Sequence, residues 1–213
     1  EAMIAQYALE DAGFMVKRGV KALIPACNTV ASQAIPRLKE QYSLPVVDII
    51  KAGATEAVKQ TKTKAIGVIG TERTIHSGAY GQAISRLDNK VAVYSVVCPL
   101  LTELVEDGKG EGVVVERTIR MYLSILARTP MDVLILGCTH YPFLLRGIAK
   151  YVGKKVVIVN PAKAGAQKLS HLLTAQAIEN PLGRGNRVYF FTGTTPGLKR
   201  IGIKEVNYVS HCR

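Results

Sequence analysis

Cys138 stands at the end of an apolar run, in a place where a cysteine can do chemistry. In the stretch "DVLILGCTHYPFLL" (residues 132–145), the apolar residues between an acid and a glycine are typical of a fully buried parallel strand. Pro142 favours a helix that begins just behind it. Cys138 is therefore predicted at the carboxyl end of a strand, where open α/β sheets bind their ligands. The alternative is a structural thiol, because cysteine is among the residue types most often buried.

A second cysteine, Cys27, stands in a similar context. The stretches "KALIPACNT" (21–29) and "DVLILGCTH" (132–140) both run from a charged residue through apolar residues to a small residue, a cysteine and two polar residues. Buried strands resemble one another, but the cysteine in the same register raises this match above chance. The echo predicts two similar α/β lobes, each presenting one thiol to a shared cleft.

Two thiols that face one substrate carbon suggest acid/base chemistry. A helix N-terminus lowers the pKa of a cysteine from its free value of about 8.5 and so favours the thiolate. One thiolate alone can act as a covalent nucleophile in acyl transfer. Two facing thiols can instead remove a proton from a carbon and return one to its opposite face, which is racemisation or epimerisation without a cofactor. The carbanion needs hydrogen-bond donors, and the "CNT" and "CTH" segments supply amides, hydroxyls and a carboxamide.

The elements that must position these thiols alternate along the chain. Short apolar runs predict strands at residues 22–25, 46–49, 65–69, 91–96, 133–136, 156–159 and 188–191. Longer amphipathic runs predict helices at 31–42, 52–61, 74–87, 113–127, 143–152 and 162–177. The alternation predicts an α/β fold of doubly wound parallel sheets with helices on both faces. A further helix is predicted over residues 1–19 with no strand before it, so the chain is expected to lack an amino-terminal segment.

The composition limits the class of protein. With 213 residues, 48% of them hydrophobic, the chain can form one domain or two. It has no run of about 18 apolar residues and no leader of basic and then apolar residues, so neither a membrane span nor a signal peptide is expected. The 4 cysteines lie far apart, without CxxC or Cys/His metal spacing. We expect a reduced cytoplasmic protein that uses no metal.

The net charge of +12 admits a basic, nucleic-acid-associated protein as an alternative. The Lys and Arg residues, however, are spread as single or paired charges. Only 6% of the residues are aromatic and none is Trp, so few side chains can stack on bases. We therefore do not expect nucleic acid as a partner. The preferred interpretation is a solvated basic surface that favours the approach of a small anionic substrate.

The cysteine segments resemble those of the glutamate racemases, in the aspartate/glutamate racemase superfamily. "ACNTVAS" (26–32) is similar to the first catalytic cysteine motif of that family. "GCTHYPFL" (137–144) is similar to the second, and its His-Tyr-Pro extension indicates the glutamate enzymes. "IGVIGTERTIHSGAY" (66–80) and "CPLLTELVEDG" (98–108) also resemble family segments. The resemblance covers nearly the whole chain.

This resemblance implies a function and a set of site residues. The chain would interconvert L- and D-glutamate without a cofactor or metal, supply D-glutamate for peptidoglycan and form a homodimer. Cys27 would act on the D-enantiomer and Cys138 on the L-enantiomer, with His140 tuning the protonation of Cys138. The residues that would hold the substrate are Asn28, Thr29, Thr71, Thr74 and Thr139, with Glu106 as a weaker candidate. The first lobe would comprise residues 1–47 and 161–213 and the second residues 48–160, with the active site in the cleft between them.

The sequence also departs from the family pattern. It contains neither the Asp-Ser-Gly nor the Pro-Tyr-Gly motif that precedes the first cysteine in glutamate racemases. An aspartate racemase, a related isomerase or decarboxylase, and a non-catalytic binding remnant are therefore kept as alternatives. Thr71 and Thr74 can also be explained as helix caps. Structural or surface roles are expected for Cys98, Cys212, His76, His171 and His211.

Overall fold

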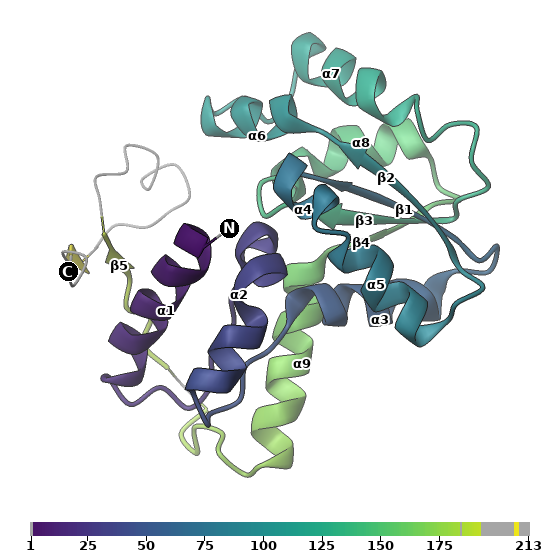
Figure 1. Ribbon diagram of the computed structural model, residues 1–213. Coiled ribbons are helices and arrows are strands. Elements are labelled where there is room, and N and C mark those ends of the chain that lie inside the picture. The colour runs from purple at the N-terminus through teal and green to yellow at the C-terminus, as the bar shows by residue number, and fades with distance from the viewer. Residues whose placement is uncertain (1, 184, 193–206, 209–213) are drawn as a thin grey trace.

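A four-stranded parallel sheet forms the centre of the computed structural model, which describes residues 2–183, 185–192 and 207–208. The strand order is β2-β1-β3-β4 (Figure 1). The strands are β1 Ala65–Gly70, β2 Ala92–Val97, β3 Val133–Gly137 and β4 Val157–Val159. Gly70 of β1 pairs with Val97 on one side and with Gly137 on the other. The carboxyl ends of three strands therefore meet at one edge of the sheet.

The two central strands, β1 and β3, are buried at every residue. A strand covered on both faces has an uninterrupted apolar sequence, which explains the apolar runs that predicted both strands. Their side chains alternate between the two faces: Ile66 and Val68 pack in the cluster on one side, and Ile69 packs in the cluster on the other. The predicted α/β class is confirmed, with a parallel sheet between two layers of helices.

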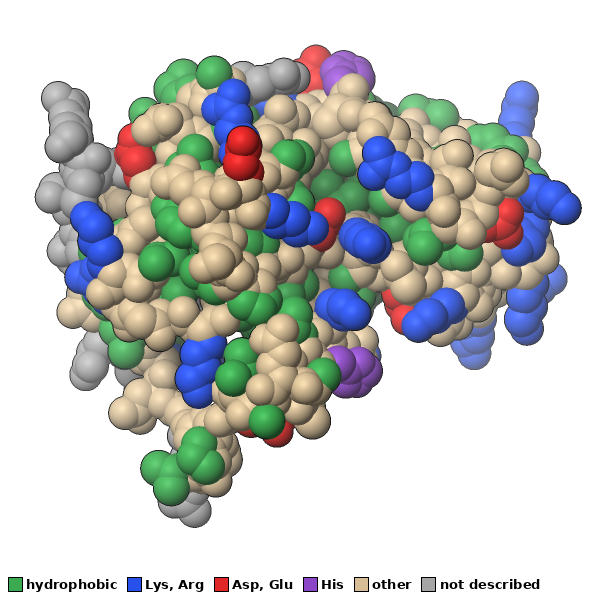
Figure 2. All heavy atoms as spheres, turned by 60° about the horizontal axis from the view of Figure 1, so that its bottom comes forward, with side chains coloured by type: hydrophobic (Ala, Val, Ile, Leu, Met, Phe, Trp, Pro, Cys, Tyr) green, Lys and Arg blue, Asp and Glu red, His purple; other side chains and the backbone are tan. Residues whose placement is uncertain are grey.

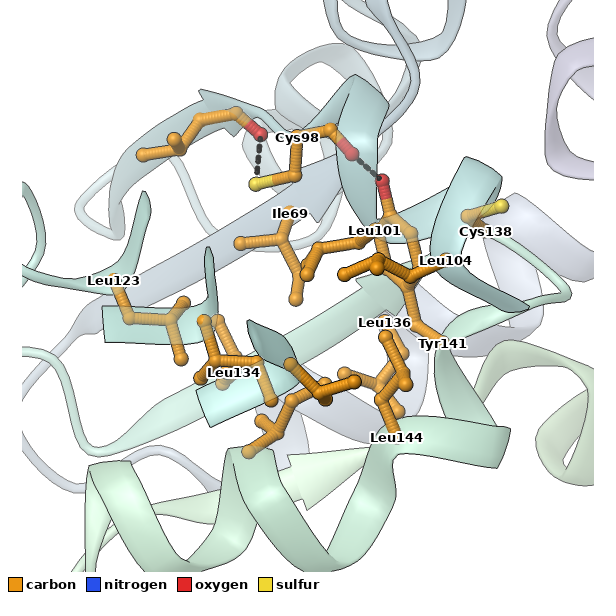
Figure 3. Close-up of a cluster of buried hydrophobic side chains, with 14 of the residues drawn as sticks. Ile69, Cys98, Leu101, Leu104, Leu123, Leu134, Leu136, Cys138, Tyr141 and Leu144 are labelled. Atoms are coloured by element: carbon orange, nitrogen blue, oxygen red, sulfur yellow. Dashed lines mark hydrogen bonds between the residues drawn. The ribbon is translucent and has the colours of Figure 1, made fainter. Parts of the chain in front are cut away.

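Helices cover both faces of this sheet (Figure 1). One face packs against α6 Pro99–Glu106, α7 Val113–Leu123, the 3₁₀ helix η1 Tyr141–Leu144 and α8 Leu145–Val152. Figure 3 shows this cluster, in which Leu134 and Leu136 of the sheet meet Leu101 of α6 and Leu144 of η1. The opposite face packs against α3 Ile49–Gln60 and α5 Ala79–Leu87. Helix α9 Pro161–Ala175 lies along α3.

A smaller layer consists of α1 Ala2–Val16 and α2 Asn28–Gln41, which lie side by side (Figure 1). Its core joins Ala5 and Ala12 of α1 to Ala34 and Leu38 of α2 through Leu23. The predicted helix over residues 1–19 is confirmed in the part that the structure describes. Residues 2–16 form it, and Gly19, with φ of +73°, lies in the turn beyond its end.

The predicted strands at 22–25 and 46–49 are wrong. They are reduced to a single parallel bridge between Leu23 and Val46, in which the N–H of Leu23 donates to the carbonyl of Pro45 at 2.9 Å. The chain has no room for a longer ladder, because Asp48 already caps α3. The two short apolar runs, next to Pro25 and Pro45, therefore form one bridged pair on either side of α2 rather than two full strands.

Several predicted helix bounds also differ from the structure. The helix predicted at 74–87 is two helices, α4 Glu72–His76 and α5, because Gly78 between them has φ of +65°. Helix α6 was not predicted. The helix predicted from 143 begins with the 3₁₀ turn η1, and the strand predicted at 188–191 is β5 Phe190–Phe191, paired with β6 Asn207–Tyr208. Across the described ranges, no helix has both the length and the apolar character needed to cross a membrane.

Candidate active site

Polar residues follow two of the strands that end together at one edge of the sheet. Thr71 comes directly after β1, and Cys138 comes directly after β3. Because Gly70 and Gly137 pair in register, Thr71 and Cys138 leave neighbouring strands at the same level. This edge is where α/β sheets bind ligands, and Cys138 lies at the carboxyl end of a strand, as its sequence predicted.

Cys138 is in contact with two polar side chains, those of His140 and Thr102. The residue is 6% exposed, and its Sγ lies 3.5 Å from Nδ1 of His140 and 3.6 Å from Oγ1 of Thr102. On its other side, Nε2 of His140 lies 3.3 Å from Oε1 of Glu106. The structure thus brings together three of the predicted site residues in the order Cys138, His140, Glu106.

The pKa of Cys138 is raised above its usual value. Burial is the largest cause, and hydrogen bonds from the main-chain N–H of His140 and from Thr102 oppose it. The charge of Cys27 raises the pKa of Cys138 further. A thiol with a raised pKa keeps its proton at neutral pH, so Cys138 needs a neighbouring base to become a thiolate.

Cys27 has a more open environment. It precedes α2 and is exposed, and its side chain forms no hydrogen bond with the helix that follows. With residues of α1 and α2, Cys27 lines a groove of about 280 Å³. The helix N-terminus behind Cys27 presents main-chain N–H groups that favour a negative charge nearby.

Three hydroxyl groups meet between α2 and α4. Oγ1 of Thr29 lies 3.0 Å from Oγ1 of Thr71 and 3.2 Å from Oγ1 of Thr74, and the latter two are 3.0 Å apart. Oγ1 of Thr71 also accepts from the main-chain N–H of Thr74, so the helix-cap interpretation is confirmed for Thr71, whereas Thr74 lies inside α4. Thr29 is distant in sequence, however, and its hydroxyl contacts join the cysteine-bearing helix α2 to the end of β1.

Asn28 and Thr139, the immediate neighbours of the two cysteines, differ in their contacts. Asn28 is 3% exposed, and its Oδ1 accepts a hydrogen bond of 2.6 Å from the hydroxyl of Tyr80. Thr139 is half-buried beside Cys138, and its side chain makes no hydrogen bond with a described residue. Of the two residues, only Asn28 forms a side-chain hydrogen bond with another helix, that with Tyr80 of α5.

Thr102 and Tyr80 are the site residues that sequence reasoning missed. Thr102 lies four positions before Glu106 on α6, and this spacing places both side chains on one side of a helix. This spacing could have identified Thr102 only if a helix had been predicted after Pro99. Tyr80 lies 52 residues from Asn28, and no local pattern could connect the two.

The structural role expected for Cys98 is confirmed. Cys98 is fully buried, and burial raises its pKa to about 12. Its Sγ–H donates to the carbonyl of Val96 at 3.6 Å, and its own carbonyl accepts from the hydroxyl of Tyr141 at 2.8 Å (Figure 3). His76 is exposed with its Nδ1 3.9 Å from Glu72, and His171 is exposed on α9, as expected. Cys212 and His211 lie outside the described residues.

Basic side chains are spread over the face of the molecule that Figure 2 shows. Lys and Arg side chains stand there among hydrophobic and uncharged ones. Within the described ranges, no group of three or more His, Cys, Asp and Glu side chains is arranged to hold a metal ion. The distinctive chemistry of the site is therefore that of its thiols, hydroxyls, carboxamide and imidazole.

The fold and the site define an α/β enzyme whose candidate active site lies at the carboxyl edge of a parallel sheet. The model of the family described as Asp/Glu/Hydantoin racemase matches residues 1–169. The chain belongs to this family.

Named relatives and solved structures agree with this assignment. The chain is 40% identical over 200 residues to a glutamate racemase of Geobacter metallireducens, and the match covers 93% of this chain and 74% of the relative. The crystal structure of glutamate racemase isoform RacE1 from Bacillus anthracis matches with a TM-score of 0.91 and 33% identity, covering 98% of this chain and 80% of that one. The Francisella tularensis glutamate racemase in complex with D-glutamate matches with a TM-score of 0.91 and 30% identity, covering 99% and 81%.

Proposed function

We propose that this chain is a glutamate racemase that moves the α-proton of glutamate between two cysteines. The observation that carries the proposal is the contact of Cys138 with His140, together with the hydroxyl contacts that join Thr29, close behind Cys27, to the end of the strand beside Cys138. Racemisation requires one group that removes the α-proton from one face of the substrate and another that returns a proton to the opposite face. Two thiols can meet this requirement when one of them, here Cys138, contacts a base that accepts its proton. The likeness to glutamate racemases supports glutamate as the substrate.

The contacts of His140 indicate how Cys138 loses its proton. With Oε1 of Glu106 at 3.3 Å as acceptor, Nε2 carries the imidazole proton, and the lone pair of Nδ1 points to the sulfur. Nδ1 takes the thiol proton, and the thiolate of Cys138 then removes the α-proton of L-glutamate. The thiol of Cys27 gives its proton to the opposite face of the carbanion, which yields D-glutamate and a Cys27 thiolate. The reverse reaction starts from that thiolate.

The remaining predicted residues hold the substrate in this proposal. The hydroxyls of Thr29, Thr71 and Thr74 already converge, and each can turn from its partner to donate to a carboxylate. Such donors also stabilise the charge that spreads from the carbanion onto the adjoining carboxylate. Thr139 and the amide nitrogen of Asn28 are the donors nearest the two cysteines in sequence. No step requires pyridoxal phosphate or a metal.

The proposal extends to organisation and cellular role. Residues 1–47 and 161–213 form one lobe and residues 48–160 the other, with glutamate bound between them. The protein acts as a homodimer in the cytoplasm and supplies D-glutamate for peptidoglycan. The net charge of +12 favours the approach of the glutamate anion.

Circular dichroism of optically pure glutamate tests the proposed reaction. We expect the signal of either enantiomer to decay to zero without added pyridoxal phosphate, and at the same rate with a chelator present. Aspartate in a parallel assay tests the alternative of an aspartate racemase, and retention on DNA at physiological salt tests that of a basic nucleic-acid-associated protein. A folded protein that leaves the glutamate signal unchanged would contradict the proposal.

A further inference from the structure

Tyr80 of α5 contacts both cysteine-bearing segments. Its hydroxyl donates to Oδ1 of Asn28 at 2.6 Å, and Asn28 directly follows Cys27. Both residues are 3% exposed. A hydrogen bond this short between two buried side chains holds the partners in one arrangement, because neither can exchange its partner for water.

The ring of the same tyrosine packs against the segment that carries the other thiol. A Cβ added at Gly137, the residue before Cys138, would lie 3.3 Å from Cε2 of Tyr80 and 2.7 Å from the carbonyl oxygen of Ile69. Only a glycine fits between this ring and the neighbouring strand. Tyr80 is therefore in close approach to the residue after Cys27 and to the residue before Cys138.

The hydrogen bond of Tyr80 also determines which way the carboxamide of Asn28 points. Burial, with the charge of Asp48 as a second cause, raises the pKa of Tyr80 well above its usual value, so the phenol remains a neutral O–H donor. A donor needs the carboxamide oxygen, so Oδ1 faces Tyr80 and the NH₂ group faces away. Nδ2 of Asn28 forms no hydrogen bond with a described residue. Every fully buried side-chain nitrogen among the described residues does have a hydrogen-bond partner, so Nδ2 is not fully buried and keeps some exposed surface.

We propose that Tyr80 is a positioning residue that fixes the carboxamide of Asn28 with its two N–H donors toward the substrate carboxylate, between the two thiols. The role rests on the proposed function, because it assumes that glutamate binds beside Asn28. Tyr80 does not touch the substrate and acts through Asn28. Without the phenol hydroxyl, the amide can rotate and present its oxygen to the substrate, which repels a carboxylate.

A double-mutant cycle between Tyr80→Phe and Asn28→Ala tests this role. Tyr80→Phe keeps the ring against Gly137 and removes only the hydroxyl, so we expect kcat/KM for glutamate to fall about tenfold, as for the loss of one buried hydrogen bond. Part of the loss should lie in KM, since the donor already meets the carboxylate in the ground state, and part in kcat, since the charge on that carboxylate grows towards the transition state. In the Asn28→Ala background, Tyr80→Phe should cost less than about twofold, because the group through which it acts is gone.

Tyr42→Phe is the matched control. The hydroxyl of Tyr42 donates to the carbonyl of Leu9 at 3.0 Å in the layer of α1 and α2, so the same deletion there should leave KM unchanged. Equal losses from Tyr80→Phe in both backgrounds, or an unchanged KM, would show that Tyr80 does not act on the substrate through Asn28 and would overturn the proposal.

Glutamate affinity by calorimetry separates this proposal from the proposed function. A protein that binds glutamate without racemising it would contradict the proposed function, and the same cycle measured on affinity would then decide the role of Tyr80. A protein that neither racemises nor binds glutamate would overturn both.

Discussion

The two thiols are held in unlike ways. Cys138 is buried behind a strand that pairs on both sides, and it is in contact with Thr102 and His140. Cys27 is exposed, and the chain before it joins its neighbours through one β-bridge. The sheet positions Cys138, whereas the position of Cys27 depends on the residues that hold helix α2 in place.

The later turns of α2 pack against α1, but the side-chain hydrogen bonds of its first turn come from the other cysteine's side of the molecule. Thr29 reaches the hydroxyls of Thr71 and Thr74, and Asn28 reaches Tyr80. The residues just after Cys27 are therefore held by α4 and α5, which follow β1. In the proposed acid/base pair, one thiol is thus fixed by a sheet, and the segment of the other is fixed by hydrogen bonds from separate helices.

Replacing either thiol tests the comparison most severely. Cys27→Ser and Cys138→Ser should each slow racemisation in both directions by about a thousandfold, because a hydroxyl is a far weaker base than a thiolate. Each variant keeps one thiol, so it should still eliminate the leaving group from one enantiomer of a chloro- or hydroxy-glutamate analogue. We expect Cys138→Ser to retain elimination from the D-like analogue and Cys27→Ser from the L-like one. Equal loss of both eliminations in both variants would show that the thiols are not a facing pair.

His140→Asn should impair the chemistry at Cys138 more than that at Cys27, with a smaller loss of activity than the replacement of a thiol. The enantiomers of glutamate have equal free energy, so kcat/KM must stay equal in both directions and cannot reveal which side was damaged. Elimination from the L-like analogue, which uses Cys138, should fall about a hundredfold, and elimination from the D-like analogue by less than about threefold. His171→Asn, on the exposed face of α9, is the control and should change neither. A loss shared equally between the analogues would place His140 in a general role.

The rates of alkylation by iodoacetamide should differ among Cys27, Cys138 and Cys98. Mass spectrometry of the labelled peptides measures the rate at each cysteine. Only the thiolate reacts, so a raised pKa delays labelling to higher pH. Cys27 is exposed and should react first. The rate at Cys138, whose pKa is raised chiefly by burial, should still be climbing above the usual thiol value of 9.0. Cys98, with a pKa of about 12, should stay unlabelled in the folded protein. Labelling of Cys138 ahead of Cys27 at neutral pH would reverse the comparison.

The same contrast explains how far the sequence predicted the fold and the site. Strand β3 and the position of Cys138 were predictable, because a strand buried on both faces keeps a continuous apolar run up to the sheet edge. The run before Cys27 has a similar sequence, but Asp48 caps a helix soon after Val46, and tertiary packing leaves only a bridge. Tyr80 was not predictable, because its partner Asn28 is remote in sequence and a lone tyrosine on an amphipathic helix suggests only a core residue.

The smallest effect is expected at Asp132, which anchors the start of β3 far from both thiols. Its carboxylate accepts from Oγ1 of Thr61 at 2.6 Å and from the main-chain N–H groups of Lys62 and Thr63 at 2.6 and 3.0 Å. Burial alone would raise the pKa of Asp132, but these hydrogen bonds outweigh it and lower the pKa from 3.8 to about 2.

A pKa that is lower in the folded state stabilises the fold above the unfolded value, and the contribution is lost as the pH falls from about 4 to about 2. Asp132→Asn should therefore lower the free energy of unfolding at pH 7 by about 2 kcal/mol, with the difference from the unmodified protein shrinking as the pH falls through that window. Urea unfolding at pH 7 and at pH 3 measures both quantities. Racemisation should stay within about twofold, because the sheet still positions Cys138 once it is folded. If Asp132→Asn instead slowed racemisation as much as His140→Asn, the position of Cys138 would depend on this anchor rather than on strand pairing, and the distinction between a sheet-held and a contact-held thiol would fail.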